Sequence, residues 1–363
     1  MASGTKRLQY VDAVRGTAIL WIILYHLLAP CAGKTVINHL TAAFTISFFF
    51  FSGFFHRSGK RSITENIANR AKALMAPFFK YSLSFWVIGS VYLVLTRAEP
   101  LREAFLCLRN FFAGCIWNRV IQGWFGWEYY SLGKRYYYLA DFWFLIAMLF
   151  ASILFFLIAD AMLASKARCI LAVIVLFAAT GALKHFQVDL PYNIQLVPFW
   201  TAFMLLGAFA GQQKLMELPS LSKGARWGIA LLALAAGITV SMLCQPFPNL
   251  FRGSFGEGEV LSMLKLIAGT VPFIWGIGLF FALIEEAGVR IKELAWFGSH
   301  SLIFYVSHMF LAWIICTVTG FSLQYGEIIT GDILIKSILL ALACIALGIV
   351  WNILAEKLRP NKE

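Results

Sequence analysis

Long apolar segments alternate with short polar ones along almost the whole chain. A membrane-spanning helix needs roughly 20 mostly apolar residues, and ten segments come close to that length. The pattern therefore predicts an all-α, polytopic membrane protein with about ten transmembrane helices. The ten segments lie near residues 15–31, 39–56, 76–96, 137–159, 168–184, 194–212, 225–244, 260–284, 299–319 and 332–352.

The stretch between the third and fourth segments follows a different pattern. Residues 101–118 are apolar but interrupted by Arg102, Glu103 and Arg109, which is typical of an interfacial or re-entrant piece rather than a span. The longer stretch 97–135 is rich in Trp and Tyr. Such residues usually form an aromatic belt at the membrane surface, and stacking on a sugar is the alternative.

Composition and charge agree with a membrane protein and predict its orientation. Hydrophobic residues make up 60% of the chain, charged residues only 13%, and the mean hydropathy is +0.77, which excludes an ordinary soluble protein. Ten spans place eighteen Lys and Arg on the N-terminal side and nine on the other, so both termini are expected in the cytoplasm. We expect a cytoplasmic segment 1–14, one transmembrane domain 15–352 and a cytoplasmic tail 353–363. The net charge of +12 is dispersed between spans, which disfavours nucleic-acid binding.

Three ionisable side chains, Asp12, Arg15 and His26, lie on or beside the first apolar segment. Each such group costs roughly 2.5 to 3.5 kcal/mol at membrane depth, so it usually marks a functional site. Eleven residues at 100° each come within about 20° of three full turns, which puts Arg15 and His26 on one face, about 16 Å apart along the axis. Asp12 can pair with Arg15 at i, i+3. A positive anchor and a titratable imidazole suit a ligand with an anionic head and an extended arm.

Each of these residues also has a structural interpretation. Arg15 can act as an orientation anchor that snorkels to the lipid headgroups. His26 can be a polar residue that hydrogen-bonds to a neighbouring helix. The seven cysteines are odd in number and contain no C-x-x-C pair, so they indicate neither a disulfide framework nor a metal site.

The chain opens with residues 8–16, Leu8-Gln9-Tyr10-Val11-Asp12-Ala13-Val14-Arg15-Gly16, followed by an aliphatic run and Tyr25-His26. This opening resembles a known family, the integral-membrane acyltransferase family 3, which includes bacterial enzymes that O-acetylate cell-surface polysaccharides. It is the most specific part of the resemblance. Four later pieces are similar to family motifs and extend the resemblance to residue 308. They are Phe48-Phe49-Phe50-Phe51-Ser52-Gly53-Phe54, Arg70-Ala71-Lys72-Ala73-Leu74-Met75-Ala76-Pro77, Phe142-Trp143-Phe144-Leu145 and Phe297-Gly298-Ser299-His300-Ser301-Leu302-Ile303-Phe304-Tyr305-Val306-Ser307-His308.

The resemblance implies transfer of an acyl group, most often acetyl, from cytoplasmic acyl-CoA to a hydroxyl of a cell-envelope glycan or glycolipid in the bacterial inner membrane. His26 would be the general base, since an imidazole with a reference pKa near 6.5 suits proton transfer at neutral pH; a transient acyl-His26 is the alternative. Arg15 would bind the anionic part of CoA, because its donor fork matches phosphate oxygens, and Asp12 would hold Arg15. Arg70 and Lys72 are further candidates for CoA binding, with ordinary positive-inside residues as the alternative.

Four other residues are assigned to the pocket or the acceptor side with less support. Ser52 would let helices approach beside the thioester, and Trp143 would wall the acyl pocket; packing is the usual explanation for both. Tyr305 and His308 lie three apart on one helical face. For His308 we favour a structural or acceptor-side role over that of a second base.

The main rival is a transporter or flippase of a small polar or acyl-bearing solute that uses Asp12, Arg15 and His26 as a proton or anion pathway. Transporters commonly have repeated halves with helices broken at matching positions. Prolines such as Pro77 and Pro272 show no two-fold pattern, which disfavours this hypothesis. A subunit of an envelope-polysaccharide complex without its own activity is a weaker option.

Overall fold

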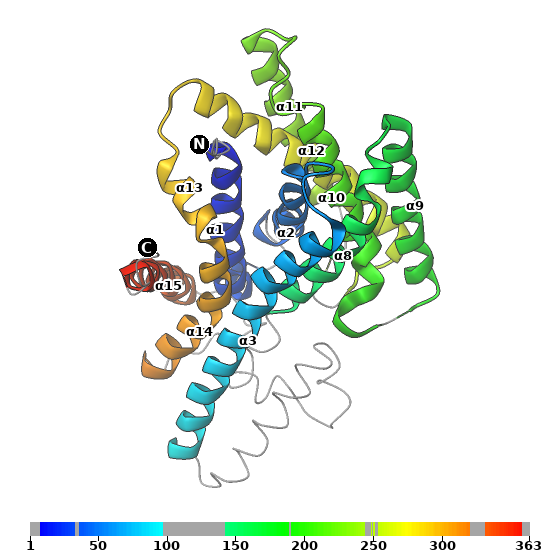
Figure 1. The fold of residues 1–363 in the computed structure, drawn as a ribbon. Helices are drawn as coiled ribbons and strands as arrows, with labels where there is room; N and C mark the ends of the chain where they lie inside the picture. The colour runs from blue at the N-terminus through cyan, green and yellow to red at the C-terminus, as the bar shows by residue number, and fades with distance from the viewer. Residues whose placement is uncertain are drawn as a thin grey trace. The chain divides into compact units, whose positions relative to one another are not determined.

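The computed structural model describes residues 8–32, 36–96, 142–188, 190–243, 248, 250, 253–319 and 331–357. The regular elements in these ranges are α-helices and one 3₁₀ helix (Figure 1), which confirms the all-α prediction. The aromatic-rich stretch 97–135 lies outside them. The elements are α1 Gln9–Ala32, α2 Val36–Phe54, α3 Ile63–Thr96, α8 Trp143–Met162, α9 Lys166–His185, η1 Pro191–Leu196, α10 Val197–Gln212, α11 Lys223–Met242, α12 Glu259–Glu286, α13 Lys292–Ser299, α14 Ser301–Thr319 and α15 Gly331–Lys357.

Within the described ranges, seven helices are long and apolar enough to cross a membrane, and α13 with α14 forms a further candidate that is bent by 75°. The protein is therefore a multi-pass membrane protein. The count of about ten spans and the cytoplasmic location of both termini stay predictions. Two helices start earlier than hydropathy indicates: α1 begins at Gln9 rather than near residue 15, and α3 at Ile63 rather than near residue 76. Hydropathy marks the lipid-compatible part of a helix, and its polar first turns extend beyond that part.

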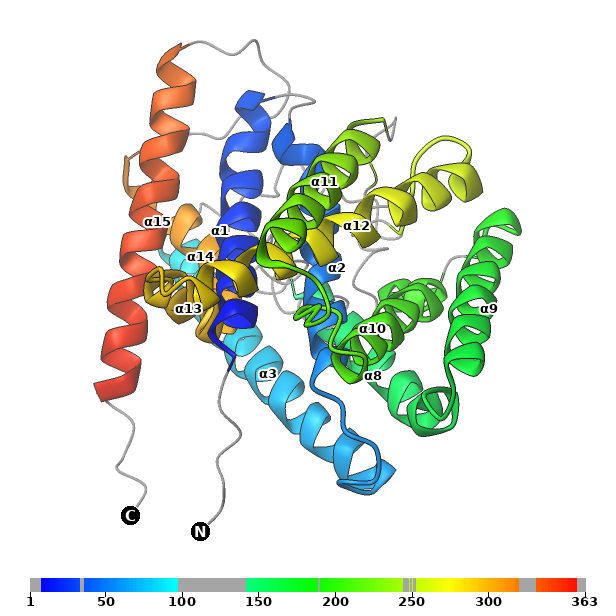
Figure 2. The ribbon, with the colours of Figure 1, turned by 90° about the horizontal axis from the view of Figure 1, so that it is seen from above.

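The chain forms two compact units. The first unit contains Met1–Phe51, Ala210–Pro248 and Phe255–Glu363. In it, α1 packs against α12, α13, α14 and α15 (Figures 1 and 2). The carboxylate of Glu285 on α12 accepts the backbone N–H of Tyr10 at 2.9 Å, which satisfies one of the unpaired donors at the start of α1. An apolar core joins α1, α14 and α15 and includes Ile19, Ile23, Leu27, Phe304, Leu311 and Leu340.

The second unit contains Ser52–Phe209 and Asn249–Ser254. Its helix α3 packs along α8, and α8 also contacts α9 and η1. Aromatic rings fill its interior: the ring of Phe177 lies 5.7 Å from that of Phe199 and 5.5 Å from that of Phe203. Near the end of α8, Asp160 lies 2.8 Å from Nε2 of His56. This pair ties the segment after α2 to α8.

Candidate active site

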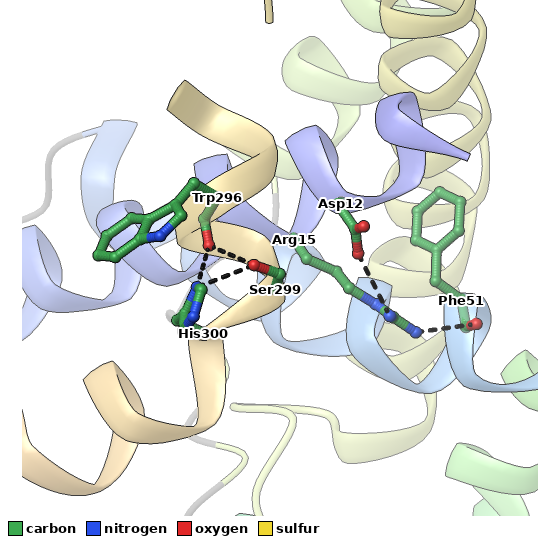
Figure 3. A network of polar contacts seen from close by, with 6 residues as sticks. All are labelled: Asp12, Arg15, Phe51, Trp296, Ser299 and His300. Atoms are coloured by element: carbon green, nitrogen blue, oxygen red, sulfur yellow. Dashed lines mark hydrogen bonds and ion pairs between the residues drawn. The ribbon is translucent and has the colours of Figure 1, made fainter. Parts of the chain in front are cut away.

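The predicted pairing of Asp12 with Arg15 is present at the start of α1 (Figure 3). Nη1 of Arg15 lies 3.9 Å from Oδ1 of Asp12, and the two side chains are 24% and 8% exposed. At this distance the contact is an ion pair rather than a hydrogen bond. The guanidinium also donates from Nη2 to the carbonyl oxygen of Phe51, at 3.2 Å. Phe51 lies in the last turn of α2, where carbonyls have no partner within the helix and carry partial negative charge. Arg15 therefore joins α1 to the C-terminal end of α2.

A backbone contact between α1 and α13 holds this part of α1. A Cβ atom on Gly298 would collide with the carbonyl oxygen of Asp12 and come within 2.9 Å of the amide nitrogen of Gly16. A Cβ atom on Gly16 would collide with the carbonyl of Leu294 and lie 3.1 Å from the nitrogen of Gly298. Small residues permit such close crossings of membrane helices. The two glycines thus fix α13 against the turn of α1 that carries Asp12 and Arg15.

The chain turns sharply directly after this crossing, between α13 and α14. Oγ of Ser299 donates to the carbonyl oxygen of Trp296 at 2.7 Å, and Nδ1 of His300 lies 2.8 Å from the same oxygen (Figure 3). Because a carbonyl only accepts, Nδ1 of His300 carries a proton. These bonds provide partners for a carbonyl at the end of α13. His300 therefore has a local structural role at the bend.

His26 lies deeper along α1 and meets α14. Its ring centroid is 5.2 Å from that of His308, with an angle of 41° between the rings. The ring of Tyr25 stands edge-on to that of His26 at 5.0 Å, and Tyr305 lies 6.3 Å from His308. His308 is only 2% exposed. The predicted proximity of Tyr305 to His308 is confirmed, and the structure adds His26 to this pair.

The second unit contains a separate polar cluster around Arg70. Its guanidinium donates to Oγ of Ser52 on α2 and, from Nε at 3.1 Å, to Oγ of Ser152 on α8. Ser152 is fully buried and donates in turn to the carbonyl of Met148 at 2.6 Å. Arg70 thus links α2, α3 and α8. Lys72, two residues further along α3, points elsewhere and is exposed.

Trp143 packs among aromatic rings of the second unit. Its ring lies 6.0 Å from that of Phe144 and 6.3 Å from that of Trp200, which is fully buried. These contacts agree with a packing role, and its place at an acyl pocket stays a prediction. Of the sequence-predicted residues, Asp12, Arg15, His26, Tyr305 and His308 belong to the first unit, and Ser52, Arg70, Lys72 and Trp143 to the second.

Sequence reasoning missed four partners in these clusters. The carbonyl of Phe51, the hydroxyl of Ser152, and the contacts of Gly16 with Gly298 and of His26 with His308 were not foreseen. The glycines do occur within the motifs that carry the family resemblance, which is a signal that could have indicated them. Among the described residues, no cluster of three or more His, Cys, Asp or Glu side chains is arranged to hold a metal ion.

The fold and these clusters define a multi-pass, all-helical membrane protein with a partly buried ion pair and a histidine on its first helix. The sequence model of the family described as an acyltransferase domain, acyltransferase family 3, matches residues 8–357. The chain belongs to this family, as its motifs predicted. No curated protein and no solved structure matches it.

Proposed function

We propose that the protein is an acyl-CoA-dependent O-acyltransferase of the bacterial inner membrane. It transfers an acyl group, with acetyl as the first choice, to a hydroxyl of a cell-envelope glycan or glycolipid. The observation that carries the proposal is the arrangement on α1, with a partly buried Asp12–Arg15 pair at one end and His26 further along. The chain also matches an acyltransferase family over nearly its whole length. Buried ionisable groups on a membrane helix cost free energy and usually serve a function.

The proposed reaction is a direct acyl transfer. A ring nitrogen of His26 takes the proton of the acceptor hydroxyl, and the oxygen attacks the thioester carbonyl carbon. The new C–O bond forms as the C–S bond breaks, and CoA leaves as a thiolate that takes the proton back from the imidazolium of His26. No metal and no further co-reactant are needed.

Arg15 and Asp12 form the donor side of the proposed site. The side chain of Arg15 is 24% exposed, and a guanidinium can bind phosphate oxygens of the donor with its planar fork of N–H groups. Asp12 holds its orientation and compensates its charge. Arg70 and Lys72 stay candidates for binding CoA phosphates from the sequence alone.

The test is binding and consumption of radiolabelled acetyl-CoA by the detergent-purified protein. His26→Ala should still bind acetyl-CoA but lose its consumption, whereas Arg15→Ala should lose binding. His185→Ala and Arg168→Ala are matched controls, because both residues are exposed on α9, and both should behave as wild type. Wild-type turnover in His26→Ala would refute the base assignment.

One structural feature favours the transport hypothesis, namely the break between α13 and α14, since transporters often build their sites at broken helices. Absence of any acyl-CoA interaction in folded wild-type protein would move the assignment to transport. Uptake of the unmodified solute into proteoliposomes would then be the deciding measurement.

A further inference from the structure

His308 is held in one tautomer by the backbone of its own helix. Its Nδ1 lies 2.8 Å from the carbonyl oxygen of Tyr305 and 3.1 Å from that of Phe304. Both oxygens can only accept a hydrogen bond, so Nδ1 carries the proton. In the neutral ring, Nε2 therefore has a free lone pair and no hydrogen.

This Nε2 atom is buried and has no hydrogen-bond partner among the residues that the structure describes. The whole His308 residue is only 2% exposed. An unpaired buried acceptor costs free energy, so its presence needs a reason. Because Nε2 of His308 is unprotonated, it cannot stabilise the negative charge that develops on a thioester oxygen, since that task needs a hydrogen-bond donor. Nε2 can only accept a hydrogen bond from an N–H or O–H group.

The imidazole of His26 is the polar ring next to it, with 5.2 Å between ring centroids. The two rings are tilted by 41° to each other. The terminal side-chain torsion of a histidine is soft, so rotation of the His26 ring is the movement that we expect to turn one of its nitrogens toward Nε2.

We propose that His308 is the positioning residue of His26. Its Nε2 accepts the N–H group of one His26 nitrogen and so fixes the tautomer in which the other nitrogen carries the lone pair. This inference rests on the proposed function, in which that second nitrogen takes the hydroxyl proton. When it does, His26 becomes an imidazolium with two N–H groups. One stays bonded to His308, and the other returns its proton to the CoA thiolate, so the step balances without a second base.

The experiment compares His308→Leu, which removes the acceptor, with His308→Gln, whose side-chain oxygen can replace it. We expect His308→Leu to lower kcat on the order of 10- to 100-fold, by analogy with the partners that orient metal-bound histidines. The KM for acetyl-CoA should stay unchanged, and His308→Gln should recover much of the rate. His185→Leu on α9 is the control for loss of an exposed histidine. His308→Phe is a second apolar variant if His308→Leu does not fold.

A second readout does not depend on activity. The ring nitrogens of labelled histidines are observed by ¹⁵N NMR in detergent, where we expect His308 with its proton on Nδ1 and a shift of the His26 signals in the apolar variant. Unchanged His26 signals in a folded apolar variant would overturn the inference, as would a rate in His308→Gln as low as in His308→Leu. If wild-type protein does not consume acetyl-CoA, a shift of the His26 signals supports the pair while the proposed function fails.

Discussion

Two arginines in this protein are held in contrasting ways. In the first unit, Arg15 faces a carboxylate and a helix-end carbonyl, both negative or partly negative. In the second unit, Arg70 donates to two neutral hydroxyls, those of Ser52 and Ser152. A charge beside an opposite charge is compensated, and at Arg15 part of it still reaches the surface. At Arg70, the two hydroxyl contacts connect three helices. The comparison suggests that Arg15 can take an anionic ligand, and that Arg70 holds α2 and α8 to α3.

The largest loss of stability and activity is expected where α1, which carries Arg15, crosses α13 in direct backbone contact. Gly298→Ala puts a methyl group into the carbonyl of Asp12, and overpacking of this kind costs typically 1–3 kcal/mol, occasionally more. We expect a clearly lower Tm and loss of acetyl-CoA binding. The control is Gly224→Ala on α11, where a Cβ atom meets nothing within 4 Å. Equal melting temperatures of the two variants would show that the crossing of α1 and α13 is looser than described.

A middle-sized effect should separate the two arginines directly. Arg15→Lys keeps the charge beside Asp12 but loses the donor fork. It should raise the KM for acetyl-CoA about 10- to 100-fold, since a hydrogen bond to a charged group contributes roughly 1.5–3 kcal/mol and each 1.4 kcal/mol corresponds to a factor of ten. Arg70→Lys should lower the Tm and leave that KM unchanged. Both variants are compared by acetyl-CoA titration and by thermal unfolding. A raised KM with an unchanged Tm in Arg70→Lys would show that Arg70 binds the acyl-CoA donor rather than joins helices.

The smallest effect concerns the hydroxyls around Arg70. Ser152→Ala removes one acceptor and should lower stability by about 1 kcal/mol, with activity retained. Ser84→Ala is the matched control, because Ser84 on α3 makes the same bond to a carbonyl four residues back, 2.8 Å to Lys80, but is exposed. A Tm that falls equally in both variants would show that Arg70 gains little from Ser152.

Local spacing explains which parts of the candidate site could be predicted. Asp12 with Arg15 and Tyr305 with His308 are both three residues apart, and helical geometry alone brings such pairs together. The helical class and most of the apolar spans follow in the same way from composition and hydropathy. Each of these predictions requires only the sequence of a single helix, without knowledge of its neighbours.

The other contacts depend on which helices become neighbours. Periodicity tells which face of α1 carries His26 but not that α14 covers this face with His308. The partner of Arg15 on α2 is the backbone of Phe51, and a backbone carbonyl has no residue signature. The bend after α13 was also not foreseen, because the segment 299–319 is apolar enough on average to be read as one span, and hydropathy does not report the direction of a helix.

The contact between Gly16 and Gly298 also sets an order of events during synthesis. Roughly 280 residues separate the two glycines, so at 5–20 residues per second the ribosome needs about 15 to 55 seconds to make the second after the first. During that time α1 carries Asp12 and Arg15 without the helix that later fixes their turn. A chain that stops before α13 never acquires this support, and the part of the site made first is therefore among the last to be completed.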